Sequence, residues 1–153
     1  PELDHRLDAL LTKYSKHILN LNNTFIVIEG GFVLSHIEGK KGKNTYSIDS
    51  IASMTQSLLI TAEKCSWLLK KMRVNTILID CLDQYQFIHK IRKKFLFSTQ
   101  LEKGKQKLGL LRLILPRYVQ KIEDIIQNIE FIRNYDEMPK IDTIISELVI
   151  SRG

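Results

Sequence analysis

Residues 25–39 read FIVIEGGFVLSHIEG, in which two adjacent glycines separate two hydrophobic runs. Such a pair can open a phosphate-binding loop, but that requires a helix to begin directly after the glycines, with its free N–H groups aimed at the anion. The residues after Gly31 are instead rich in β-branched and aromatic types, which favour a strand. The stretch therefore predicts a β-hairpin, with Gly30 and Gly31 supplying the positive φ angles of a two-residue turn.

The composition is that of a soluble globular protein with one domain. The chain has 153 residues, of which 44% are hydrophobic and 26% charged, enough to bury a single core. No apolar run reaches the length of about 18 residues that a membrane span needs, and the first residues resemble neither a signal nor a transit peptide. We therefore expect a cytoplasmic protein. Cys65 and Cys81 lie in hydrophobic surroundings, which predicts two buried free thiols rather than a disulfide.

Apolar periodicity and turn residues predict the order of elements. They indicate a helix at 2–17, a turn at 20–23, strands at 24–29 and 32–38, a helix at 51–72, strands at 74–81, 85–91 and 95–101, and helices at 108–133 and 139–150. Asp49 or Ser50 is the expected cap of the middle helix. Pro116 predicts a kink or a break in the long helix. The nearly continuous apolar centre of residues 74–81 predicts burial on both faces.

This order and two stretches of sequence resemble the Roadblock family of dynein light chains and GTPase regulators. Residues 25–39 are similar to the family's first hairpin, and residues 96–126, LFSTQLEKGKQKLGLLRLILPRYVQKIEDII, are similar to its last strand and the start of its final helix. Gly109 is the most specific single match. The resemblance covers residues 3–133, so we expect a Roadblock-like domain at 1–133 and a C-terminal extension at 134–153. A longin or profilin-like domain is the closest alternative.

The resemblance implies an α/β (α+β) fold with a five-stranded antiparallel sheet of order 2-1-5-4-3. The middle helix would cover one face, and the first and last helices the other. Family members typically dimerise by pairing their third strands with the middle helices side by side, and many serve as platforms or regulators for Ras-like small GTPases. The resemblance thus implies a non-catalytic scaffold, dimeric with itself or with a paralogue, that acts on a GTPase without a cofactor of its own.

The middle helix also indicates a partner surface from its own residues. One apolar stripe is predicted to cover the sheet; it consists of Ile51, Met54, Leu58, Ala62, Cys65, Leu69 and Met72. Ile60 and Trp67 point to the opposite side, where a monomer would leave them exposed as scattered apolar residues. Because tryptophan is enriched in binding hot spots, and because residues 74–81 lack the lysine or proline that protects an unpaired edge, we predict an interface. Its residues are Gln56, Leu59, Ile60, Glu63, Trp67, Lys71, Val74, Thr76 and Leu78.

The net charge of +6 and the pI near 9.3 favour an acidic partner. In the implied topology, the loops after the second and fifth strands leave the sheet at the same end, which predicts a basic dock for an acidic protein or a membrane leaflet. Its residues are Lys40, Lys41, Lys43, Lys103, Lys105 and Lys107. The alternative is that these lysines are solvated loop residues.

The sequence offers few candidate catalytic residues. The four histidines lie in separate elements without metal-ligand spacing, and Asp80 and Asp83 flank a turn that such residues commonly shape. We therefore predict no catalytic residue, metal or cofactor. Two alternatives remain: a nucleic-acid binder, which the pI favours but which lacks a basic and aromatic platform, and a small-molecule sensor on a profilin-like sheet.

Overall fold

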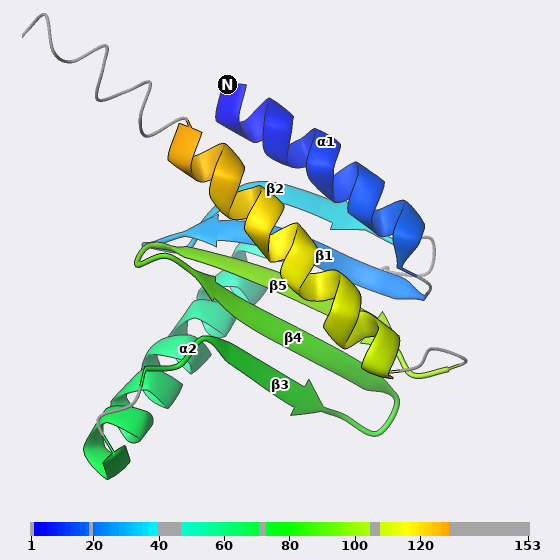
Figure 1. Cartoon of the computed structure of the whole chain (residues 1–153). Coiled ribbons are helices and arrows are strands. Elements are labelled where there is room, and N and C mark those ends of the chain that lie inside the picture. The colour runs from blue at the N-terminus through cyan, green and yellow to red at the C-terminus, as the bar shows by residue number, and fades with distance from the viewer. Residues whose placement is uncertain (1, 19, 40–46, 71–72, 105–107, 129–153) are drawn as a thin grey trace, which may run out of the picture.

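The computed structural model describes residues 2–18, 20–39, 47–70, 73–104 and 108–128 (Figure 1). Its elements follow the predicted order: α1 (Glu2–His17), β1 (Leu21–Ile28), β2 (Phe32–Glu38), α2 (Ile48–Lys70), β3 (Thr76–Asp80), β4 (Gln84–Ile91) and β5 (Phe95–Glu102). Residues 108–128 form a further helix, called here the 108–128 helix. The helix predicted at 139–150 lies outside the described residues.

The five strands form one antiparallel sheet of order β2-β1-β5-β4-β3, which confirms the expected fold class and strand order. The last strand in the chain, β5, lies in the middle and pairs with both β1 and β4. Its first five residues, 95–99, are all buried. A strand flanked by neighbours on both edges and covered on both faces accommodates such a continuous run of non-charged residues.

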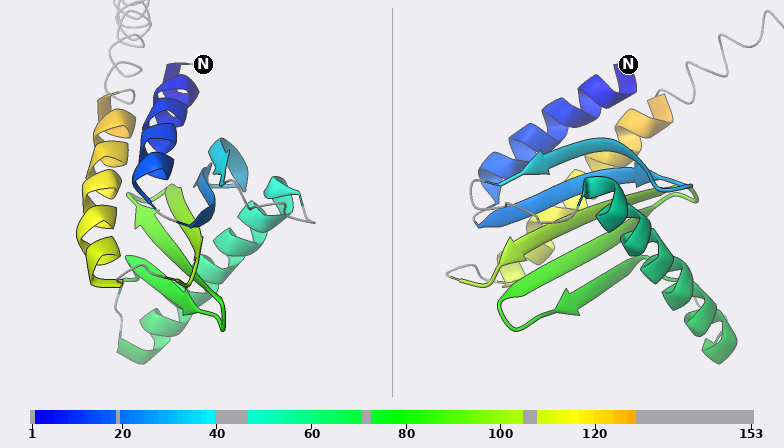
Figure 2. Two further views of the ribbon diagram at one scale, coloured as in Figure 1. Left: turned by 90° about the vertical axis from the view of Figure 1, so that its right-hand side faces the viewer. Right: turned by 180° about the vertical axis from the view of Figure 1, so that it is seen from behind.

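Helices cover both faces of the sheet. Figures 1 and 2 show α1 and the 108–128 helix side by side on one face and α2 on the opposite face. The larger core lies under the helix pair. At its centre, the Tyr14 hydroxyl of α1 lies 2.8 Å from Oγ1 of Thr99 in β5, and the Tyr14 ring packs edge-on against Phe97 and Tyr118. The smaller core lies under α2 and consists of Phe25, Val27, Ala52, Leu59, Ile88 and Leu96.

The first hairpin forms as predicted, with positive φ angles of 98° at Gly30 and 85° at Gly31. The connection between the paired residues Ile28 and Phe32 has three residues rather than the expected two. The Glu29 N–H donates to the Lys94 carbonyl at 2.7 Å, so this loop is bonded to the turn between β4 and β5. The two turns therefore lie at the same end of the sheet.

The predicted turn at 20–23 is wrong except for its first residue. Asn20 has a positive φ of 57°, and β1 begins at Leu21. Asn23 pairs in the sheet with both Glu38 and Gln100, so ladder hydrogen bonding on two sides outweighs the turn preference of asparagine. The cap of α2 is also earlier than expected: the Ser47 hydroxyl accepts from the Ser50 N–H at 3.3 Å.

Pro116 does not break the helix in which it lies, because residues 108–128 are helical without interruption. Proline removes one backbone hydrogen bond, but the apolar side of the helix continues through that point. Leu111 and Leu115 before the proline, and Tyr118 and Ile122 after it, are all buried against the sheet and α1. This shared packing holds the two parts of the helix on one surface. No helix in the described part of the chain is long and apolar enough to cross a membrane.

Candidate partner interface

The strand β3 lies at one side of the sheet and has β4 as its neighbour. The Lys90 N–H donates to the Asn75 carbonyl at 2.8 Å, which fixes the alternation of backbone groups along the antiparallel pair. From this register, the N–H and C=O groups of Ile77 and Ile79 point toward β4. Those of Thr76, Leu78 and Asp80 point outward from the sheet.

The side chains of β3 alternate between half-buried Ile77 and Ile79 and exposed Thr76, Leu78 and Asp80. The predicted burial on both faces is therefore wrong. Ile77 and Ile79 pack at the margin of the α2 core, whereas Leu78 lies on the other face and is 38% exposed. The cause is the position of β3 at the sheet edge, where helices cover it incompletely. The described strand contains no lysine and no proline, two devices that commonly protect an unpaired edge.

The face of helix α2 that packs on the sheet is not the apolar stripe predicted from the sequence. Its buried residues are Ala52, Thr55 and Leu59, whereas Met54 and Leu69 of the predicted stripe are exposed. Small and polar residues can form this contact because the Thr55 hydroxyl donates to the Ile51 carbonyl at 2.8 Å. A buried hydroxyl that is hydrogen-bonded in its own helix costs little.

Two apolar flanks of α2 remain on either side of this buried face. At about 100° per residue, Leu58 and Leu69 lie on one flank, and Ile60 and Trp67 lie on the other. The second flank faces the turn between β4 and β5, because Ile60 and Trp67 line hollows together with Lys93 of that turn. The flank of Leu58 and Leu69 therefore faces away from that turn.

The structure divides the predicted interface residues into three groups. Thr76 and Leu78 lie on the outward edge of β3, and the half-buried Val74 precedes this strand by two residues. Ile60 and Trp67 lie on the flank of α2 that faces the turn. A third group faces the chain's own sheet: Gln56, Leu59 and Glu63 line a hollow above β4 and β5. Lys71 lies outside the described residues.

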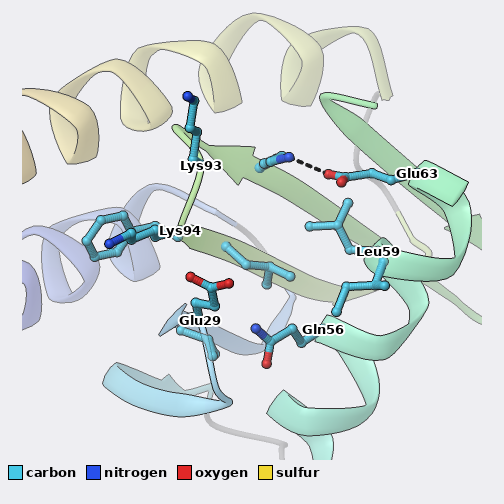
Figure 3. Close-up of a pocket in the computed structure, with 11 residues that line it drawn as sticks. Glu29, Gln56, Leu59, Glu63, Lys93 and Lys94 are labelled. Carbon is cyan, nitrogen blue, oxygen red and sulfur yellow. Dashed lines mark hydrogen bonds and ion pairs between the residues drawn. The ribbon is translucent and has the colours of Figure 1, made fainter. Parts of the chain in front are cut away.

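Leu59 is a correction to the predicted interface, because it is 7% exposed and belongs to the chain's own core. Glu63 is also occupied within the chain, since its Oε1 accepts from Lys90 Nζ of β4 at 2.5 Å. Figure 3 shows this ion pair at one side of the hollow, with Leu59 and Gln56 along α2 and with Glu29, Lys93 and Lys94 on the opposite side. The hollow is small, about 160 Å³.

Only part of the predicted basic dock lies in the described chain. The Gly39 N–H donates to the Asn22 carbonyl and the Glu102 N–H to the Asn20 carbonyl, so β2 and β5 end at the same end of the sheet, as expected. Lys103 forms an ion pair with Asp80, and this hydrogen bond raises the Lys103 pKa. Its ammonium also lies 4.7 Å from the centre of the Tyr85 ring. The other five lysines, Lys40, Lys41, Lys43, Lys105 and Lys107, lie outside the described residues.

The titratable residues of the described chain are dispersed. Burial lowers the pKa of His36, and it lowers the pKa of His89 to about 4. His89 lies between the rings of Phe87 and Phe97, with its Nδ1 3.1 Å from Oγ1 of Thr76. The described residues contain no group of three or more His, Cys, Asp or Glu that could hold a metal ion. The two cysteines are free, as predicted, but both are exposed rather than buried.

No family model and no curated protein matches the sequence. Solved structures do match the fold. An MglB described as having a tetrameric arrangement superposes with a TM-score of 0.73 and 16% identity, over 84% of this chain and 93% of its own. MglB of Myxococcus xanthus superposes with a TM-score of 0.68 and 16% identity, over 80% and 96%. A Roadblock/LC7 domain from Streptomyces avermitilis gives 0.67 and 12%, over 78% and 97%. The chain has the Roadblock/LC7 fold.

Within the Roadblock/LC7 fold, the surface that sequence reasoning missed is the outer part of α2. Met54, Leu68 and Leu69 are 72%, 83% and 76% exposed, although Met54 and Leu69 were predicted to face the sheet and Leu68 was assigned to no surface. The residue type alone does not show whether an apolar side chain is buried or exposed. The only available signal was the excess of apolar residues in the second half of α2, more than one sheet-facing stripe requires.

Proposed function

We propose that the chain forms a homodimer through β3 and α2 and acts as a non-catalytic scaffold or regulator of a Ras-like small GTPase. The observation that carries the proposal is the outward edge of β3, which presents unprotected backbone groups beside an exposed apolar flank of α2. Natural sheets usually protect such an edge or pair it. A second copy of the same edge is a self-complementary partner for a two-fold contact.

The geometry suggests how two copies meet. An antiparallel pairing centred on Leu78 would bring the outward N–H and C=O groups of one β3 against the same groups of the other. The sheet would then continue from one copy into the next, with the two α2 helices on the same face. In that arrangement the α2 flank of Leu58 and Leu69 faces the partner's helix. Ile60 and Trp67, which face the turn between β4 and β5, lie outside the contact.

Two findings support a regulatory role over a catalytic one. The described residues bring together no metal-ligating cluster, and their paired carboxylates and lysines, such as Glu63 with Lys90 and Asp80 with Lys103, form structural ion pairs. Proteins that resemble this one in fold and motif tend to regulate a GTPase by repositioning the GTPase's own groups. Such a regulator needs a shaped surface rather than a reactive residue.

The test is affinity capture from a native lysate with the full chain as bait, with and without a non-hydrolysable GTP analogue, and with identification of the retained proteins. The matched control bait is Leu113→Lys, a change at an exposed residue of the 108–128 helix on the opposite face of the sheet. We expect both baits to retain a small GTPase whose recovery depends on the nucleotide. Recovery of nucleic acid alone, sensitive to nuclease, would overturn the proposal in favour of the nucleic-acid alternative.

A further inference from the structure

The C-terminal end of α2 is an apolar projection. The helix crosses the sheet obliquely, and its last turns extend beyond β3 (Figures 1 and 2). Three consecutive residues there are exposed: Trp67 at 60%, Leu68 at 83% and Leu69 at 76%. On a helix, three consecutive side chains point in directions that together span about 200°. A single neighbouring helix or strand covers one flank, so it cannot bury all three.

Basic residues surround this projection from two separate elements. Arg73 and Lys93 line a hollow of about 390 Å³ together with Trp67, Glu63 and Lys90. Further exposed lysines lie on the same end of the molecule: Lys64, Lys70 and Lys94. Two described carboxylates lie near these cations: Glu63, whose charge is compensated by Lys90 at 2.5 Å, and Glu29, which lines the neighbouring hollow with Lys93 and Lys94. The projection is therefore an apolar tip inside a positively charged rim.

We propose that this end of the molecule binds a membrane surface that contains anionic lipid. Tryptophan is favoured at the boundary between headgroups and acyl chains, leucines at a projecting tip can enter the acyl region, and lysine and arginine beside them attract anionic headgroups. An acidic protein would neutralise the charge of the lysines and arginines, but it would cover only one flank of the helix. A lipid layer surrounds a projecting tip, which matches apolar side chains that point in several directions.

This surface shares only Leu69 with the proposed dimer contact, and it is separate from the predicted basic dock. Trp67 and Leu68 do not face the β3 edge, and the turn at 92–94 lies at the opposite end of the sheet from Lys103, which follows the far end of β5. Membrane binding therefore does not depend on the proposed GTPase function. Either can fail without the other.

The test uses Trp67, the single tryptophan of the chain, as a reporter in the whole 153-residue chain. Vesicles of phosphatidylcholine alone are compared with vesicles that contain about 30% phosphatidylserine. We expect the anionic vesicles to carry the protein in a flotation gradient and to shift the Trp67 emission to shorter wavelength. Each lysine near an anionic surface contributes about five-fold to the partition coefficient, so Lys93→Gln with Lys94→Gln should lower it about 25-fold.

Two matched controls distinguish binding through this surface from a general effect of net charge or of exposed apolar residues. Lys13→Gln with Lys16→Gln removes two exposed lysines of α1, and Leu113→Glu adds a carboxylate at an exposed leucine far from α2; both should bind like the native chain. Leu68→Glu should lose binding while keeping the native circular dichroism. The proposal is overturned if the native chain does not float with anionic vesicles at low salt, or if the α1 pair weakens binding as much as the pair at the turn.

Discussion

The outward N–H of Leu78 allows the proposed dimer to be tested at a single backbone group. Because this N–H points away from β4, Leu78→Pro removes a donor that the chain's own sheet does not use. The residue before a proline favours an extended conformation, which Ile77 already has as part of β3. The substitution should therefore leave the monomer folded and block the edge.

The size of the effect follows from the two-fold symmetry. Each copy loses one interchain hydrogen bond, worth about 1 kcal/mol net, and each leaves a carbonyl of the other copy without a partner. Counted over both copies, the loss is at least about 2 kcal/mol, or about 30-fold in the dimer dissociation constant. Leu78→Ala is the matched control, because it removes the side chain and keeps the N–H. It should weaken the dimer by less.

The assay is sedimentation equilibrium over a range of concentrations, with light scattering after size exclusion as a second measurement and thermal unfolding to check the monomer. The native chain should be dimeric at micromolar concentration, and the proline variant should be a folded monomer under the same conditions. A proline variant that is folded and as dimeric as the native chain would refute the pairing of β3 edges. So would a native chain that is monomeric at tens of micromolar.

Three further predictions concern other parts of the molecule. In the same sedimentation assay, Leu69→Lys should weaken the dimer and Trp67→Lys should not; the reverse order would move the contact to the other flank of α2. The pKa of His89 is about 4 in the folded chain, against 6.5 when unfolded. As pH falls, the unfolded chain therefore binds a proton before the folded chain does, which lowers the free energy of unfolding. Urea denaturation should show a loss of about 3 kcal/mol between pH ~6.5 and ~4. His89→Phe should flatten that dependence, and an unchanged slope would contradict the assignment. Gly31→Ala should lower the unfolding free energy by about 1–2 kcal/mol, because φ is 85° there and the new Cβ would lie 2.9 Å from a serine hydroxyl of α2. Gly109→Ala should instead raise the unfolding free energy by up to about 1 kcal/mol, because Gly109 lies in a helix with open space around it.

The elements were predictable because their signals are local. The helix at 2–17 agrees with α1 at both ends, since its apolar spacing has no competing interpretation. The hairpin was fixed by Gly30 and Gly31, where the required φ is available to few residues. The order of the strands in the sheet has no such local signal, because no single segment encodes which strands are neighbours. It came from the resemblance of residues 25–39 and 96–126 to a family.

The orientation of α2 was not predictable from its sequence. Its apolar residues form more than one stripe, and periodicity alone favoured the one that contains Met54 and Leu69 over the one that contains Ala52 and Thr55. Which stripe is buried depends on where the helix crosses the sheet and how far it extends past it. These are properties of the assembled fold. The same cause exposes Cys65, which the local hydrophobic context had placed inside the core.

The central position of β5 has a consequence for how the chain folds. Its partner β1 lies 67 to 80 residues earlier, as the pairs Ile28–Phe95 and Leu21–Leu101 show, whereas the hairpins β1–β2 and β3–β4 form from neighbouring segments. A nascent chain therefore holds two separate hairpins, each with a bare edge, until β5 is synthesised and inserts between them. Such long-range closure slows folding, and the waiting edges can pair with other chains. Truncation before residue 95 should leave an aggregation-prone chain rather than a smaller domain.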